Sequence, residues 1–321
     1  MAVHTVLSSG EIEALCRFFD LASLRAHEGI ASGSINTNYA LTTEKGRFFL
    51  TLREGKRRGD VEDEVRLLTH LADARFPVSR PIVGMQGPIA MSHDLPALCF
   101  PWLAGEELSA SQIQPDHSRE VGEHLGRMHV LCESLPFDRP NPYRMETLRQ
   151  WLDSLAGISH REIANLLPEL EDEYAWLKSH RDHGLPRGVI HADLFIDNTK
   201  WIGGRLSAIY DFEMACRDIL ALDLAIVLLS WCFAEETFDH ARVRALVTGY
   251  QTKRKLNSDE RQGLFAEARF GALRYTLSRI RDFELSPLPA ERLFRKDFRR
   301  YLARLRALRA LGPLGFGEIV G

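Results

Sequence analysis

The sequence has no paired cysteines, no excess of charge of one sign and no apolar run long enough for a membrane. Its five cysteines, which form no Cys-x-x-Cys motif, are Cys16, Cys99, Cys132, Cys216 and Cys232. An odd, scattered set predicts reduced thiols and a cytoplasmic location. The most apolar stretch, residues 219–234, contains Asp223 and is too short to span a bilayer. The N-terminus lacks a basic segment followed by an apolar one, so we expect neither a signal peptide nor a membrane partner.

Charge and composition exclude further classes. The 41 Lys and Arg residues are balanced by 44 Asp and Glu residues, for a formal net charge of −3. A chain without a basic excess is a poor match for a phosphate backbone, so we expect no nucleic-acid partner. Hydrophobic residues make up 45% and charged residues 26% of the 321 residues. This is ordinary globular composition, and the length suits a two-lobed enzyme. The oligomeric state is not indicated.

The first third of the chain has the pattern of a small β-rich domain. Ser8 followed by Glu11 has the spacing of a capping box and predicts a first helix. Alternating apolar residues between 27 and 54 predict three antiparallel strands joined by two hairpins. Helical spacing returns at 60–71, and residues 77–103 predict short strands broken at 84–87 and at Pro96. We place the boundary of this N-terminal, nucleotide-covering lobe at residue 103.

Residues 104–321 predict a mainly helical lobe with one β interlude. Helical apolar faces run over 121–132 and 163–177, and the apolar stretch 219–234 predicts a buried helix. Strand-like segments at 189–190, 200–202 and 206–210 interrupt the helices. Gly203 and Gly204 lie between the last two and predict a two-residue hairpin turn with positive φ.

Two short motifs in that interlude carry the chemistry. His191-Ala-Asp193 is followed five residues later by Asn198, and after the hairpin comes Asp211-Phe-Glu. Phosphoryl transfer needs a carboxylate to accept a hydroxyl proton and hard oxygen ligands that hold magnesium across the phosphates. We therefore predict Asp193 as catalytic base, Asn198 and Asp211 as Mg²⁺ ligands, ATP as phosphate donor, and an orienting role for His191.

These motifs resemble those of the protein-kinase-like fold, in the His-x-Asp form of the aminoglycoside phosphotransferase group. The resemblance implies an α+β, bilobal fold with a small antiparallel β-rich N-lobe and a larger, mainly helical C-lobe. Each motif alone also fits ordinary turn residues, because Asp and Asn are common where strands end. The two motifs in this order, joined by a hairpin and preceded by a β-rich segment, favour the kinase-like interpretation.

The resemblance also implies where nucleotide binds. Ser32, Gly33, Ser34 and Asn36 lie between two strands, where this fold keeps a phosphate-covering loop. An ordinary hairpin loop has the same appearance. Phe100 and Trp102 fall where the hinge offers backbone groups to adenine, although any edge strand leading into a linker also fits.

One feature of the kinase pattern is missing. Thr51 stands where a strand lysine is expected, while Glu64 is suitably placed as the helix glutamate that normally pairs with it. Arg53 or Lys56 could substitute for the lysine. Strand alternation puts Arg53 on the same side as Thr51, but we favour a solvated surface position for its long side chain.

Several stretches narrow the resemblance to the bacterial homoserine kinases of this fold. They include residues 29–39, 46–52 and 188–195, with Asp223, 231–233 and Ala272-Leu-Arg274. Members of that family also have Thr in place of the strand lysine. The resemblance covers nearly the whole chain and implies transfer of the ATP γ-phosphate to the hydroxyl of L-homoserine, in threonine biosynthesis.

The substrate candidates are polar residues of the N-terminal strands and of a late helix: Asn38, Arg274, Ser278, Arg279 and Asp282. Helical spacing puts positions 274, 278, 281 and 282 on one face, with arginine suited to a carboxylate and Asp282 to an ammonium group. An exposed helix carrying charge pairs has the same pattern. Two other functions remain open, namely a kinase for another amino alcohol, sugar or aminoglycoside, and a nucleotide-binding module without catalysis.

Overall fold

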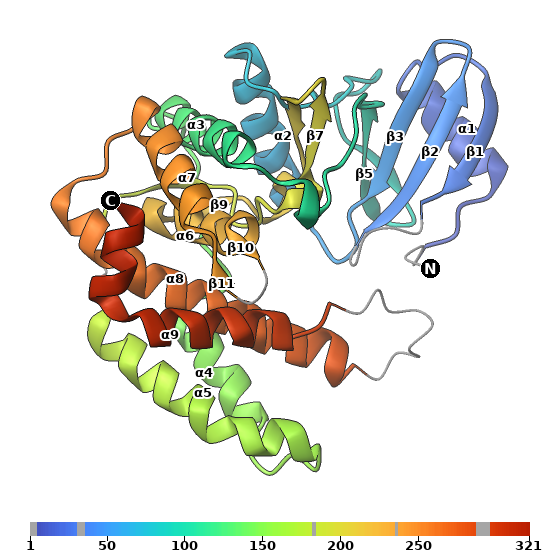
Figure 1. Ribbon diagram of the computed structural model, residues 1–321. Coiled ribbons are helices and arrows are strands. Elements are labelled where there is room, and N and C mark those ends of the chain that lie inside the picture. The colour runs from blue at the N-terminus through green and yellow to red at the C-terminus, as the bar shows by residue number, and fades with distance from the viewer. Residues whose placement is uncertain (1–4, 31–35, 182–183, 235–236, 287–295) are drawn as a thin grey trace. The chain divides into compact units, whose positions relative to one another are not determined.

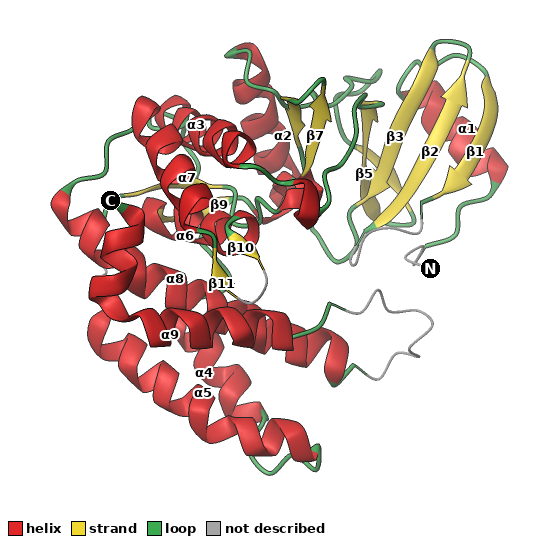
Figure 2. Ribbon diagram, in the orientation of Figure 1, coloured by secondary structure: helices red, strands yellow, loops and turns green. Residues whose placement is uncertain are grey.

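In the computed structural model the chain divides into two compact units. The structure describes residues 5–30, 36–181, 184–234, 237–286 and 296–321. The first unit contains Met1–Gly105 and Ser207–Glu213; the second contains Glu106–Leu206, Met214–Ser286 and Lys296–Gly321. Strands dominate the first part of the chain and helices the second (Figures 1 and 2). No helix of the described ranges is both long enough and apolar enough to cross a bilayer.

The first unit is built on one antiparallel sheet. Its strands lie in the order β1-β2-β3-β5-β4. Their bounds, with those of the two helices, are α1 Ser9–Phe18, β1 Leu24–Gly29, β2 Thr37–Thr43, β3 Gly46–Leu52, α2 Arg58–Asp73, β4 Ala90–Ser92 and β5 Leu95–Pro101. Ile12 of α1 packs with Leu41 and Leu50 of the sheet in one apolar core. The three predicted strands, their hairpins and the helix over 60–71 are confirmed.

Local sequence explains the ends of these elements, with one exception. The predicted capping box is present at α1, where the Ser8 backbone N–H donates to Glu11 Oε2 at 2.7 Å and the Glu11 N–H donates to Ser8 Oγ. The expected break at Pro96 is wrong, because Pro96 lies inside β5 opposite Met91 of the short strand β4. A proline is tolerated there because the ladder at that residue uses only its carbonyl, which accepts from the Arg53 N–H at 2.8 Å.

The second unit is mainly helical. Its helices are α3 Pro115–Leu131, α4 Met145–Ser154, α5 Arg161–His180, α6 Leu220–Trp231, α7 His240–Lys253, α8 Ser258–Arg279 and α9 Arg299–Val320. Short strand pairs accompany them: β6 Arg187–Ile190 with β9 Cys216–Ile219, β7 Thr199–Ile202 with β8 Arg205–Ile209, and β10 Phe233–Ala234 with β11 Thr237–Phe238. Gly203 and Gly204 turn between β7 and β8 with φ of 58° and 76°, as predicted.

Close packing of helices fixes the frame around the catalytic motif. Every residue of α6 is buried, which confirms the predicted buried helix. A Cβ atom on Gly122 of α3 would lie 2.1 Å from the Leu246 carbonyl oxygen of α7, and one on Gly249 of α7 would lie 2.0 Å from the Arg119 carbonyl oxygen of α3. The two helices therefore approach closely because glycines stand at their contact. Helix α8 packs against α6 and α9.

The late helix differs from the prediction at its end. Helix α8 stops at Arg279, and the chain continues through a π-helical turn, Ile280–Glu284. A π turn holds more residues than an α turn, so the α-helical spacing that put 281 and 282 on the face of 274 does not hold. Arg274 is buried, whereas Arg281 and Asp282 are exposed and pair with each other at 2.5 Å. The prediction of one shared face is therefore wrong.

Candidate active site

The segment that carries Asp193 is held by a buried carboxylate. Strand β6 ends at Ile190, and Ala192 takes a φ of 64°, an unfavourable conformation for a non-glycine residue. Asp223 of α6 stabilises it by accepting the His191 N–H at 2.7 Å and the Ala192 N–H at 2.9 Å. Asp223 is fully buried. Two charge-assisted hydrogen bonds thus fix the backbone immediately before Asp193.

Asp223 is itself backed by a buried polar chain. Its Oδ2 lies 3.1 Å from His129 Nε2, and His129 Nδ1 lies 2.8 Å from the Tyr250 hydroxyl. Burial raises the pKa of Tyr250, so its hydroxyl stays protonated near neutral pH. His129, which no sequence motif indicated, therefore supports the segment that carries Asp193. His191 is also buried, and its Nδ1 accepts the Asp193 N–H at 3.3 Å.

Asp193 has one direct side-chain contact that the sequence motif did not reveal. The Tyr275 hydroxyl of α8 lies 2.9 Å from Asp193 Oδ1 and 2.9 Å from the Ala192 carbonyl oxygen. Burial raises the pKa of Tyr275 well above its ordinary value, so it acts as a hydrogen-bond donor. Asp193 is half-buried. Its carboxylate is held in one orientation with the second oxygen, Oδ2, outside this hydrogen bond.

The two predicted metal ligands each have a geometry that suits an oxygen ligand. The Asn198 amide nitrogen donates to the Asp193 carbonyl oxygen at 2.7 Å, which turns the amide oxygen the other way. Asp211 follows β8 with a φ of 65°, a strained conformation of the kind found at functional sites. The described residues contain no group of three or more His, Cys, Asp or Glu that could enclose a metal. An amide oxygen and a carboxylate are the hard oxygen donors that Mg²⁺ takes together with phosphates, so these residue types fit that ion, and their binding of it stays a prediction.

Arg53 is not the exposed side chain that we favoured from the sequence. It is only 6% exposed. Its guanidinium hydrogen-bonds to Glu64 of α2 and lies 3.8 Å from Glu213. Burial opposes its charge, but Glu64, Glu213 and Asp211 raise its pKa. The favoured surface position is therefore wrong. Glu64, the predicted helix glutamate, has an arginine partner in place of the expected lysine.

Glu213 also connects this pair to the segment before β2. The Asn36 amide donates to Glu213 Oε2 at 2.6 Å, and the Glu54 N–H donates to Asn36 Oδ1 at 3.2 Å. Ser32, Gly33 and Ser34, predicted to cover phosphates, lie outside the described residues. Asn36 therefore ties the end of that segment to the Asp211-Phe-Glu turn.

The remaining nucleotide candidates lie on β3 and β5 or just after them. Thr51 is fully buried and its hydroxyl has no hydrogen-bond partner. Phe100 is buried in β5, while Trp102 is 38% exposed and lies under the Arg47 guanidinium at 4.0 Å. Their contact with adenine stays a prediction.

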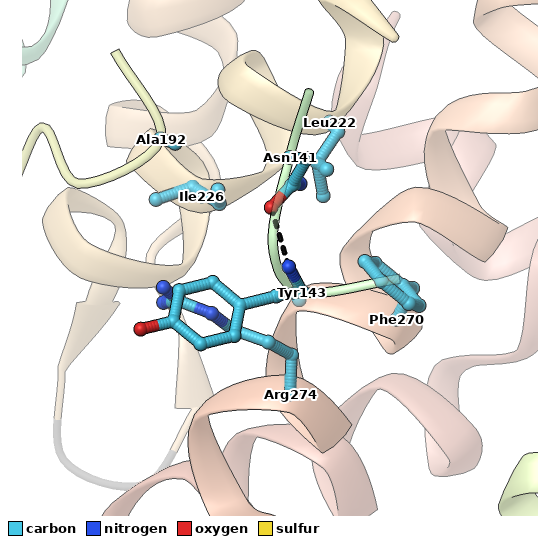
Figure 3. Close-up of a pocket in the computed structure, with 8 residues that line it drawn as sticks. Asn141, Tyr143, Ala192, Leu222, Ile226, Phe270 and Arg274 are labelled. Carbon is cyan, nitrogen blue, oxygen red and sulfur yellow. Dashed lines mark hydrogen bonds between the residues drawn. The ribbon is translucent and has the colours of Figure 1, made fainter. Parts of the chain in front are cut away.

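Arg274 lies at a small cavity beside Ala192, shown in Figure 3. Residues that line the cavity include Asn141, Ile226 and Phe270, and the cavity is too small to hold a metabolite. The Arg274 guanidinium lies 4.1 Å from the centre of the Tyr143 ring and 3.8 Å from that of Tyr275. Its Nη1 has no hydrogen-bond partner among the described residues.

The other substrate candidates are not gathered in one place within the second unit. Ser278 donates to the Tyr275 carbonyl oxygen, and Arg279 is buried and donates to the Asp297 carbonyl oxygen at 2.9 Å. Asp282 is exposed, as described above. Asn38 belongs to β2 of the first unit, where its carbonyl oxygen accepts from Ile30.

The anchored Asp193 segment of the second unit and the Arg53–Glu64 pair of the first unit are features expected of a kinase-like phosphotransferase. The family model described as a phosphotransferase enzyme family matches residues 27–256, and the chain belongs to that family.

Relatives of similar length narrow the comparison. A homoserine kinase from Rhizobium meliloti (strain 1021) is 36% identical over 97% of this chain and 95% of its own. One from Parvibaculum lavamentivorans is 35% identical over 99% of both chains. Among solved structures, the amicoumacin kinase hAmiN in complex with AMP-PNP, Ca²⁺ and Ami has a TM-score of 0.73 at 15% identity, covering 95% of this chain and 93% of its own. The structural match, together with the antiparallel sheet of the first unit and the helices of the second, confirms the predicted fold class.

Proposed function

We propose that this protein transfers the γ-phosphate of ATP to the side-chain hydroxyl of L-homoserine. One observation carries the proposal: a chain with the anchored Asp193 segment matches curated homoserine kinases over 97% or more of its length. ATP and Mg²⁺ as cofactors, and a cytoplasmic location, belong to the same proposal.

In this proposal Asp193 receives the proton of the acceptor hydroxyl. Tyr275 and Asn198 position it from two sides, one through Oδ1 and one through the backbone carbonyl. A base fixed in this way loses little orientational entropy when the substrate binds. Asn198 and Asp211 would hold the metal ion. When bound, magnesium neutralises charge on the phosphoryl group that ATP supplies.

In the first unit, Arg53 takes the place of the missing lysine as the partner of Glu64. It is the buried cation of this unit nearest to the Asp211-Phe-Glu turn. We propose that it orders Glu213 and thereby the turn that carries Asp211, rather than acting as a flexible surface side chain. The unpartnered Thr51 hydroxyl gives no indication of a role in phosphate binding.

The acceptor is tested by ADP release in a coupled assay with homoserine, homoserinol, choline and an aminoglycoside at equal concentrations. We expect the highest kcat/KM for homoserine, and a much lower one for homoserinol, which lacks the carboxylate. A higher kcat/KM for choline or the aminoglycoside would replace homoserine with that class of acceptor. ADP release that is independent of any acceptor would reject the proposal altogether.

A further inference from the structure

The buried arginines of this protein are of two kinds. Three of those among the described residues have a buried carboxylate partner, in the pairs Arg53–Glu64, Arg181–Glu267 and Arg269–Glu173. Three others, all on α8 or α9, have no carboxylate partner within the residues that the structure describes: Arg274, Arg279 and Arg304. A buried charge is normally paired, because removing it from water is costly. The second kind therefore needs an explanation.

Arg279 and Arg304 share one aromatic ring. Their guanidinium carbons lie 4.3 Å and 4.4 Å from the centre of the Tyr301 ring on α9. Arg279 is 7% exposed and Arg304 is 2% exposed, and Nε of Arg304 has no hydrogen-bond partner. Two positive charges are thus held close together, with a ring but no acid between them.

The position of this pair is close to the catalytic base. The Tyr301 ring packs on Tyr275 with 4.8 Å between ring centres, and the Tyr275 hydroxyl contacts Asp193 at 2.9 Å. Phe195, two residues after Asp193, packs against both tyrosines. Half-buried Lys296 also contacts this aromatic group, with its ammonium nitrogen 5.9 Å from the centre of the Phe195 ring.

The charge balance differs from that at Arg274. Burial, together with the neighbouring charges of Arg300 and Arg279, lowers the pKa of Arg304 to about 10, although Tyr301 opposes the shift. Burial likewise lowers the pKa of Arg279. At Arg274 burial is outweighed by Tyr275, Tyr143 and Asp193, so that its pKa is raised. The described residues thus compensate the positive charge of Arg279 and Arg304 only in part, and a bound anion would stabilise it.

We propose that Arg279 and Arg304, arranged about Tyr301, form the receptor for the α-carboxylate of the acceptor amino acid. This inference rests on the proposed function and adds to it a residue, Arg304, that no sequence motif indicated. Arginine suits a carboxylate because its planar donors can bind both oxygens. In homoserine a short aliphatic chain separates hydroxyl and carboxylate, so the carboxylate receptor has to lie near Asp193, and Tyr301 and Tyr275 link the two arginines to that residue.

Steady-state kinetics of Arg304→Met test the receptor, with Arg306→Gln as a control on the same helix. Arg306 is 54% exposed and pairs with Glu169, so its loss should leave both Michaelis constants unchanged. Arg304→Met should raise KM for homoserine roughly tenfold to a hundredfold, the value of a charge-assisted contact, and leave KM for ATP unchanged. Homoserinol has no carboxylate, so its KM should be the same in the wild type and in Arg304→Met.

Thermal unfolding supplies a readout that is independent of activity. Homoserine alone should raise the Tm of the wild type and of Arg306→Gln, but not that of Arg304→Met. Without ligand, Arg304→Met should unfold at the wild-type temperature or above it, because the change removes an uncompensated buried charge. Arg269→Met should unfold at a lower temperature, because buried Glu173 then loses both hydrogen bonds from Arg269 and keeps Arg309 only at a distance of 3.9 Å.

The outcomes separate this inference from the proposed function. If the wild type does not phosphorylate homoserine, the proposed function fails whatever Arg304 does. If it does, and Arg304→Met keeps the wild-type KM for homoserine or raises that for homoserinol equally, the receptor is wrong. A large loss of Tm or failure to fold in Arg304→Met would make Arg304 a structural residue and would also overturn the inference.

Discussion

Single hydrogen bonds at Asp193 decide how well this base is placed. Tyr275→Phe removes only the hydroxyl that holds Asp193 Oδ1, so we expect kcat to fall by about tenfold, the effect of one hydrogen bond to a charged group. KM for both substrates should change little, because neither needs that hydroxyl in order to bind. Steady-state kinetics measure both constants. A wild-type kcat in Tyr275→Phe would show that the contact does not position the base.

The proposed metal ligands give a second prediction at this scale. Asp211→Asn and Asn198→Ala should each lower kcat by at least about a hundredfold, because charge on the phosphoryl group is then poorly neutralised. Thermal unfolding without ligand should remain close to the wild type for Asn198→Ala, whose side-chain amide donates to the Asp193 backbone carbonyl. Activity that persists in both variants at saturating ATP and Mg²⁺ would remove these residues from the metal site.

Variants of Thr51, which lies in β3, and of Arg53, which directly follows β3, form a matched pair. Arg53→Met leaves Glu64 and Glu213 buried without their cation, so the free energy of unfolding should fall by about 3–5 kcal/mol. Thr51→Val replaces an unpartnered buried hydroxyl by a methyl group of similar size and should be neutral or stabilising. Urea unfolding measures both. Equal stability of Arg53→Met and the wild type would mean that the ion pair is not structural.

At the residue scale the sequence indicated candidate residues, whose chemical roles stay predictions, but not the contacts that support them. The His-x-Asp and Asp-Phe-Glu motifs identified Asp193, Asn198 and Asp211, because their spacing is local. Tyr275 lies 82 residues from Asp193 in the chain and His129 lies 94 residues from Asp223, and no local pattern reports such contacts. Asp223 enters the sequence analysis as an interruption of an apolar run and as part of the family resemblance, but not as a support for the Asp193 segment. A charged residue inside such a run is a usable signal, since burial of a carboxylate requires partners.

At the scale of elements, α3 packs closely against α7, and these helices carry His129 and Tyr250, which support Asp223. Gly122→Ala should lower the free energy of unfolding by about 1–3 kcal/mol, because its Cβ would meet the Leu246 carbonyl oxygen at 2.1 Å. Gly317→Ala in α9 is the control, since no atom lies within 4 Å of a Cβ there. That change should stabilise by about 0.5–1 kcal/mol through helix propensity. Chemical denaturation measures both, and a Gly122→Ala protein as stable as the control would contradict the close packing.

Elements were well predicted wherever periodicity alone decides them. The capping box at Ser8, the alternation over the first three strands and the Gly203-Gly204 turn all concern neighbours in sequence. The two errors arose where a regular pattern was extended too far. Pro96 was taken as a strand break although its carbonyl alone serves the ladder, and α-helical spacing was carried past Arg279 into a π turn.

At the scale of the whole molecule, the chain forms two compact units, and the proposed site residues are divided between them. The first unit holds Arg53, Glu64 and Asp211, and the second holds Asp193, Asn198 and the arginines of α8 and α9. Their composition was predictable, because a β-rich pattern precedes a helical one. The charge pairing of the buried arginines was not predictable, since it depends on which acids each helix meets after packing.

The central claim is Asp193-dependent phosphoryl transfer to homoserine, and ³¹P NMR of the complete reaction tests it most directly. With homoserine, ATP and Mg²⁺, the wild type should convert the γ-phosphate signal into that of a phosphomonoester, one for each ADP formed. Asp193→Asn should bind homoserine with a similar homoserine-induced Tm shift but form the phosphomonoester at least about a hundredfold more slowly. Release of inorganic phosphate in place of the ester, or ester formation at the wild-type rate by Asp193→Asn, would contradict the account.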